Sequence, residues 1–283
     1  MIEELETLIK LVPYITDRQI TSVLEVVKSY PNNGKGKHRG IPGVRGGSLP
    51  RQGGVESGGG DDSDLENKLT NNRFKISADN NKFEHGAFES YLVDIEGDGR
   101  AINKPPLKGD PFPYKSKTEL SENEVNAYEL SKELGLDIVP PTVMRQGASF
   151  QQWIEGCVTW NNKEDDYGYN TYEDLGTMTF LDVVNCNVDR HGGNIIVHKD
   201  TGRVYAIDNG LTRITEWDKP DNYFSFEINV NDNVYTKKVR SIANDLIKYS
   251  EKRKHLETKY GINADILKIR LVSFKELMDA NTN

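Results

Sequence analysis

Two short polar segments, each placed directly after an apolar run, constrain the fold of this chain most strongly. Residues 187–194 read NVDRHGGN, and residues 204–210 read VYAIDNG. The interval from Asp189 to Asn194 is the spacing at which a phosphoryl-transfer loop holds a base at its start and a metal-binding amide at its end. Asp208 ends an apolar strand, where the second metal ligand is expected. The chain must therefore fold so that these two segments meet.

Composition excludes several classes of function. The net charge of -8 argues against a general nucleic-acid binder, because affinity for polyanions depends on clustered Lys and Arg, and a local basic patch stays open. Cys157 and Cys186 are the two cysteines, and their spacing favours neither a disulfide framework nor a structural zinc site. The acidic start and the absence of a long apolar window predict no secretion signal and no stable membrane association. We expect a protein of a reducing cytoplasm.

The sequence divides into three parts. Residues 1–30 carry apolar side chains at helical spacing in two runs and predict a helical hairpin, a candidate site for an assembly partner. Residues 31–67 are rich in glycine and charge, so we expect a flexible linker. Residues 68–283 carry the candidate catalytic domain, in which strand and helix signals alternate.

The order of these signals predicts an α+β, two-lobed protein-kinase-like fold. A hairpin is expected over 88–104, with its turn at the glycines of 96–99. Ser121 and Glu124 have capping-box form and predict a helix from Ser121 to Leu134 that Gly135 ends. The remaining expected elements are short strands near 143–144 and 150–154 and helices over 172–186, 236–260 and 263–280.

Phosphoryl transfer needs a cation on the nucleotide phosphates and a means of holding it. Lys104 ends the strand 101–104, and Ile102 shares its face, where it could cover an adenine. Glu124 has two interpretations: it is either the ion-pair partner of Lys104 or the capping partner of Ser121.

The remaining roles fall to the two polar segments. Asp189 would orient the attacking hydroxyl, while Asn194 and Asp208 would bind Mg²⁺ through hard oxygen ligands. Arg190 and His191 would stabilise either the loop or the charge that develops on the phosphate. The sequence has all three of Asp189, Asn194 and Asp208, which argues against an inactive site, because a site that had lost its function would have no reason to keep them.

Four segments resemble the phosphoinositide 3/4-kinase-related, HipA-like branch of the protein-kinase-like superfamily. They are residues 99–106, 123–130, 189–194 and 208–210, within a resemblance that spans 74–215. The resemblance implies an ATP-binding cleft between two lobes, with ATP and Mg²⁺ as cofactors.

The same resemblance also assigns individual residues. It implies that Lys104 contacts the nucleotide phosphates with Glu124 as its partner, and that Trp153, Ile154 and Glu155 lie in the nucleotide-bridging linker. Separately, residues 38–50 resemble segments of bacteriophage head-associated proteins. If the chain is of phage origin, this resemblance implies a location in the host cytoplasm or the virion.

Two departures from the kinase pattern stand out. Residues 80–88, which should cover the phosphates, contain one glycine, so no glycine-rich cradle is evident. Asn209 stands where protein kinases have the Phe of Asp-Phe-Gly, which removes a packing switch and keeps the metal ligand.

These observations predict a kinase that moves the γ-phosphoryl group of ATP to a hydroxyl, with a protein as the first-choice acceptor. Two alternatives remain open. The chain could be a lipid or small-molecule kinase, although its acidity disfavours a bilayer-embedded headgroup. It could also be an inert, kinase-shaped binding module tethered to an assembly by residues 1–30.

Overall fold

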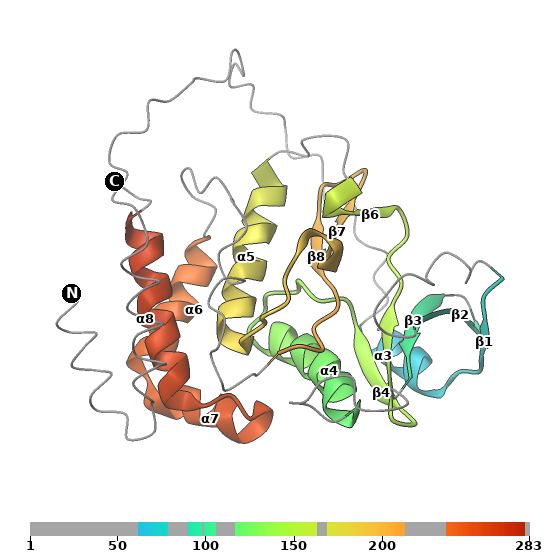
Figure 1. Cartoon of the computed structure of the whole chain (residues 1–283), viewed down its shortest axis with the longest axis horizontal. Helices are drawn as coiled ribbons and strands as arrows, with labels where there is room; N and C mark the ends of the chain where they lie inside the picture. The colour runs from blue at the N-terminus through green and yellow to red at the C-terminus, as the bar shows by residue number, and fades with distance from the viewer. Residues whose placement is uncertain are drawn as a thin grey trace, which may run out of the picture.

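The structure is a computed structural model that describes residues 62–78, 90–97, 99–105, 117–162, 169–212 and 236–280 (Figure 1). The expected hairpin 1–30, the linker as far as residue 61, the phosphate-covering segment 80–88 and the chain from 213 to 235 lie outside these residues. The described part has a sheet-containing lobe at one end and a helical lobe at the other, which confirms the expected α+β, two-lobed architecture.

The first lobe is built on a five-stranded antiparallel sheet with the order β1-β2-β3-β5-β4. The expected hairpin is confirmed for β2 and β3, and its turn uses Gly97 and Gly99, whose φ angles of 87° and 147° favour glycine. One face buries Val93, Ala101 and Phe150. The strands are β1 (Phe74–Ile76), β2 (Tyr91–Ile95), β3 (Arg100–Lys104), β4 (Thr142–Arg145) and β5 (Ala148–Gln152).

Helix α3 (Asp62–Asn71) covers this sheet. It includes residues 62–67, which were predicted as the end of the flexible linker. Leu69 is buried in the core of the sheet and Leu65 packs against it. Residues 62–67 are therefore helical, because two leucines four residues apart give this short segment an apolar stripe that the sheet covers.

Helix α4 (Lys117–Glu133) begins four residues before the predicted start. Ser121 and Glu124 are both buried inside the helix, so the predicted capping box is wrong. The start of the helix is set by tertiary contacts on the face that includes these residues, rather than by a local cap. Gly135, with a φ of 63°, follows the last turn as predicted.

The second lobe combines a small sheet with a group of helices. The predicted helix 236–260 is two helices, because the chain bends at Tyr249, which is extended (φ -105°, ψ 107°). The bend lets Leu246 and Leu256 enter the same core. The elements are β6 (Cys157–Thr159), η2 (Trp160–Asn162), α5 (Tyr169–Asn185), η3 (Gly192–Asn194), β7 (Ile195–His198), β8 (Val204–Ala206), α6 (Lys237–Lys248), α7 (Ser250–Tyr260) and α8 (Ala264–Ala280).

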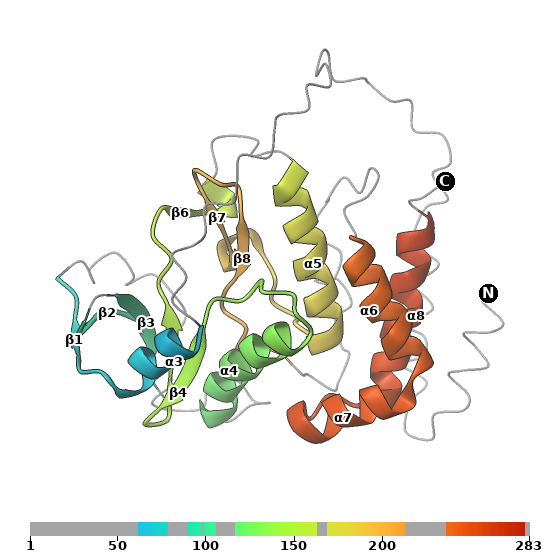
Figure 2. The same ribbon diagram turned by 180° about the vertical axis from the view of Figure 1, so that it is seen from behind.

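The larger core joins α4 to the helical lobe. Tyr128 and Leu130 of α4 are buried in the same cluster as Phe180 of α5 and Phe274 of α8, whose rings lie 5.7 Å apart. Figure 2 shows α4 between the sheet and helices α5 to α8, and α4 also contacts β4 and β5. Helix α4 is thus fixed to both lobes. No described helix is both long and apolar enough to span a bilayer.

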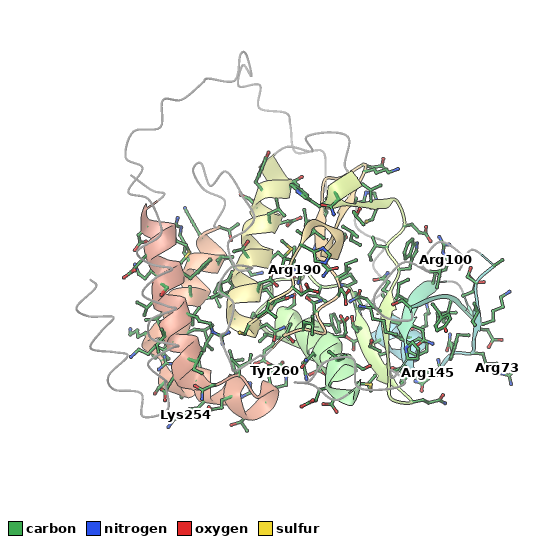
Figure 3. All side chains as sticks on the ribbon, viewed as in Figure 1. Arg73, Arg100, Arg145, Arg190, Lys254 and Tyr260 are labelled. Atoms are coloured by element: carbon green, nitrogen blue, oxygen red, sulfur yellow. The ribbon has the colours of Figure 1, made fainter. Side chains whose placement is uncertain are left out.

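The carboxylate of Glu133 attaches the end of α4 to α7. It accepts hydrogen bonds from Lys259 Nζ at 2.7 Å and Tyr260 Oη at 2.7 Å, and His255 Nε2 lies 2.8 Å away. The Tyr260 side chain is fully buried at this contact and is labelled in Figure 3. Because α4 is rigid, this contact helps to set the position of Glu124, about 13 Å along the helix.

Glu133→Gln is therefore expected to lower the free energy of unfolding at neutral pH by about 0.5–1.5 kcal/mol, since the neutral amide is a weaker acceptor and the Lys259 and His255 partners are exposed to solvent. Denaturant unfolding measures the change. Glu129→Gln is the matched control, because Glu129 is exposed on the same helix and should stay within about 0.5 kcal/mol of the parent. Equal stability of both variants would contradict a role for this contact.

The same contact predicts a pH dependence. Partial burial raises the pKa of Glu133, but hydrogen bonds from Lys259, Tyr260 and His255 outweigh it and hold the pKa below its ordinary value. Such a carboxyl stabilises the fold above its unfolded pKa of about 4.3 and loses that contribution as the pH falls through the lower folded value. The stability difference between the parent and Glu133→Gln should therefore shrink when unfolding is repeated in increasingly acidic buffer.

Candidate active site

Lys104 lies at the end of β3 between two carboxylates. Its Nζ is 2.5 Å from Glu124 Oε1 on α4 and 2.8 Å from Asp208 Oδ1, beyond β8. The side chain of Glu124 is only 4% exposed. The structure therefore brings together three predicted residues that are far apart in the sequence, and Glu124 is the ion-pair partner of Lys104.

The charges in this group are unequal. Burial opposes the charged form of Lys104, but Asp208 and Glu124 outweigh it and raise its pKa. Lys104 in turn lowers the pKa of Asp208, whereas burial, helped by the charge of Asp208, raises the pKa of Glu124. Two carboxylates share one ammonium, so the ionised group carries an excess negative charge that a cation would neutralise.

Two hydrogen bonds tie the segment 208–210 to α4. The backbone N–H of Asn209 donates to Glu124 Oε2 at 2.9 Å, and Asn123 Nδ2 donates to Gly210 O at 2.7 Å. Asp208 itself has a φ of 55°, in the left-handed region that few residues other than glycine, Asn and Asp adopt. The helix that supplies Glu124 thus also fixes the backbone directly after Asp208.

The loop after α5 is folded on itself. Asn194 Nδ2 donates to the backbone oxygen of Asp189 at 2.8 Å and lies 3.5 Å from its Oδ2, while the N–H of Asp189 donates to Asn187 Oδ1 at 2.9 Å. The N–H of Ile207 donates to Asn194 O at 3.1 Å, so the two polar segments are directly joined. Burial, with a contribution from Asp208, raises the pKa of Asp189. A carboxylate in that setting is a better proton acceptor than an ordinary one.

Arg190 and His191 have different surroundings. Arg190 is 3% exposed, and its five N–H groups donate to Asp182, Asn194, Ile207 and Asn209, so the structure favours the loop-stabilising role over direct contact with phosphate. His191 is exposed, and its Nδ1 accepts from the N–H of Gly193 at 3.1 Å. Its ring therefore caps the short helix η3.

The predicted nucleotide-bridging residues lie between β5 and β6, where the chain passes from one lobe to the other. The N–H of Trp153 donates to Arg100 O at 2.9 Å, so it is not a donor for an adenine. Arg100 lies 5.6 Å from the centre of the Trp153 ring and pairs with Glu155. Ile102 is half-buried on β3, on the same face as Lys104. Contacts of a nucleotide with Ile102, the Trp153 ring, Ile154 or Glu155 stay predictions.

The donor set suits Mg²⁺. Among the described residues no three His, Cys, Asp or Glu side chains gather as a metal cluster. Magnesium is instead held in phosphoryl-transfer sites by one or two protein oxygens, together with substrate phosphates and water. Asp208 and Asn194 supply such oxygens, and the side-chain hydrogen bonds of Asn194 to described residues use its amide nitrogen rather than Oδ1. The excess negative charge beside Asp208 favours a cation there.

Sequence reasoning missed four polar residues that hold this site together. Asn123 was hidden inside the supposed capping box, and Asn209 was interpreted as the loss of a phenylalanine. Asp182 and Asn187 carried no motif of their own. The available signal was a set of polar residues at the end of an otherwise apolar run, Asp182, Asn185, Asn187 and Arg190, all of which the structure buries.

No protein-family model matches the chain, and no curated protein sequence matches it. Solved structures that are similar include a Golgi casein kinase (13% identity, TM-score 0.47, 78% of this chain and 75% of that one). The Helicobacter pylori proinflammatory kinase CtkA is similar at 15% identity with a TM-score of 0.44, over 76% of this chain and 96% of that one. Hydra Fam20, solved with a sugar, is similar at 12% identity with a TM-score of 0.47, over 78% and 88%.

The order of elements in this chain defines its class. An antiparallel sheet whose third strand ends in a lysine is followed by a helix that supplies the paired glutamate, then by a loop with Asp and Asn and by a second Asp segment. That is the order of parts in the kinase fold. The chain therefore has a two-lobed kinase-like fold.

Proposed function

We propose that this protein is a Mg²⁺- and ATP-dependent kinase that transfers the γ-phosphoryl group to a hydroxyl of a protein acceptor. One observation carries the proposal: Lys104, Glu124 and Asp208 form a single ion-paired group, and Asp208 is joined through Ile207 to the loop that holds Asp189 and Asn194. An inert domain has no need to assemble these residues in one place.

The chemistry follows from the positions of the side chains. Lys104 lies where an ammonium can bind the nucleotide phosphates and limit their movement. Asp189 accepts the proton of the attacking hydroxyl as its oxygen bonds to the γ-phosphorus, and the bond from that phosphorus to the bridging oxygen breaks to release ADP. When bound by Asn194 and Asp208, Mg²⁺ supplies charge neutralisation on the phosphate oxygens.

Incubation of the purified chain with Mg-ATP and candidate protein acceptors, followed by intact-mass measurement, tests the proposal. The expected product carries the added mass of a phosphoryl group, on an acceptor or on the chain itself. Addition of a nucleotidyl group would assign a different transferase activity. Parallel reactions with lipid vesicles and small polyols separate a protein kinase from the lipid and small-molecule alternatives, and no transfer in any of them would favour the inert binding module.

Glu124→Gln is expected to lower kcat/KM about 10- to 100-fold, because Lys104 loses a charged hydrogen-bond partner with a typical contribution of about 1.5–3 kcal/mol. Transfer of labelled phosphate at subsaturating ATP measures the change. Glu122→Gln, an exposed position on the same helix, is the control and should retain the parental rate. Parental activity in Glu124→Gln would mean that the pair with Lys104 is dispensable.

A further inference from the structure

Arg190 lies near the centre of the molecule, between α5 and the three-stranded sheet, as labelled in Figure 3. Its guanidinium contacts Asp182 of α5 through two parallel hydrogen bonds, Nε to Oδ2 and Nη2 to Oδ1, both 3.0 Å long. Both side chains are almost fully buried, at 2% and 8% exposed. A bidentate pair of this kind fixes the plane of the guanidinium.

The remaining donors of Arg190 reach the segments on which both candidate metal ligands lie. Nη1 donates to Asn194 O at 2.7 Å and to Ile207 O at 2.6 Å. Nη2 donates to Asn209 Oδ1 at 2.5 Å. One rigid cation therefore contacts the backbone of Asn194 and the residues on either side of Asp208.

Asn209 completes the connection. Its side chain is fully buried, and its Oδ1 also accepts a hydrogen bond from Asn187 Nδ2 at 3.5 Å. Its backbone N–H donates to Glu124 Oε2. A phenylalanine at this position could accept none of the side-chain hydrogen bonds. Asn209 is therefore a specific polar partner of Arg190.

We propose that Asp182, Arg190 and Asn209 are positioning residues that set the separation of Asn194 and Asp208, and with it the affinity of the site for Mg²⁺. This inference rests on the proposed kinase function and adds to it residues that touch neither nucleotide nor acceptor. Arg190 holds both ligand segments at once, so a shift of its guanidinium moves the two ligands relative to each other. Partners of this kind typically change metal affinity 10- to 100-fold when they are removed.

Arg190→Lys tests the proposal, because lysine keeps the charge and cannot reproduce the planar, multidentate contacts. Calorimetry with a non-hydrolysable ATP analogue, at several Mg²⁺ concentrations and without metal, is the measurement. We expect the Mg²⁺ concentration for half-maximal nucleotide binding to rise roughly 10- to 100-fold, while metal-free binding of the analogue stays within about twofold.

Arg253→Lys is the matched control. Arg253 is also buried, and its Nη1 donates to the carbonyls of Leu246 and Ile247 at the end of α6, away from the candidate site. Both Arg→Lys variants should lose thermal stability, but only Arg190→Lys should need more Mg²⁺. An unchanged Mg²⁺ requirement in Arg190→Lys, or an equal rise in both variants, would overturn the proposal.

Substitutions of Asn209 keep the test decisive if Arg190→Lys does not fold. Asn209→Asp retains a side-chain acceptor for Arg190, and Asn209→Leu removes it, so the Mg²⁺ requirement should rise for leucine and not for aspartate. Equal requirements would overturn the proposal. If the parent protein binds the analogue without any dependence on Mg²⁺, the proposed function itself fails. Mg²⁺-dependent binding by the parent with no change in the variants overturns the positioning role alone.

Discussion

Asp208→Ala is expected to remove magnesium-dependent nucleotide binding and phosphoryl transfer together. Asp208 has a negative charge stabilised by Lys104, which lowers its pKa, and the structure places it next to the loop of Asn194. A carboxylate on magnesium acts in the ground state and in the transition state, so its loss weakens binding and the chemical step at once. We expect transfer to fall by roughly 10³-fold or more, since metal ligation supplies several kcal/mol of charge stabilisation.

Calorimetry with and without Mg²⁺, and a single-turnover transfer assay, measure the two effects. Asp200→Ala is the control, because Asp200 is an exposed carboxylate in the turn between β7 and β8. Asp208→Ala should still fold, since Lys104 keeps its partner Glu124 and the N–H of Asn209 keeps its acceptor. If Asp208→Ala keeps the same dependence of nucleotide affinity on Mg²⁺ as the parent, Asp208 is not a metal ligand.

Strong local patterns explain which parts of the fold were predictable. The hairpin of β2 and β3 follows from alternation around a glycine turn, and α5 follows from a long apolar run. Predictions from local patterns were wrong where contacts with residues distant in the sequence determine the structure. The capping box at Ser121 has the right residues, but the helix continues through it because Asn123 and Glu124 bind the segment 208–210.

The site was predictable to the extent that its chemistry dictates spacing. Asp189, Asn194 and Asp208 stand at intervals set by the reaction, and Lys104 and Glu124 stand in the order that the resemblance implies. The supporting residues have no such rule. Asp182 is eight residues from Arg190, and Asn209 is nineteen residues from it, so only the folded chain reveals that they form one buried network.

Asp189→Asn should separate the acceptor-orienting role from the metal-binding role. Asp189 is half-buried with a raised pKa, and it contacts Asn194 without taking part in the group around Lys104. The asparagine variant should therefore bind Mg-ATP nearly as the parent does. Turnover should fall roughly 10²- to 10⁴-fold, the typical loss when general acid-base assistance is removed, because the acceptor hydroxyl no longer transfers its proton to a carboxylate.

A single-turnover assay at saturating Mg-ATP, paired with calorimetry on the same preparation, measures this separation. His191→Gln belongs beside it, since His191 is the exposed ring nearest in sequence to Asp189 and its Nδ1 accepts from Gly193. We expect His191→Gln to cost far less activity than Asp189→Asn, because a loop cap is easier to replace than a base. Full transfer by Asp189→Asn with loss of transfer in His191→Gln would reverse the assignment and make the imidazole the proton acceptor.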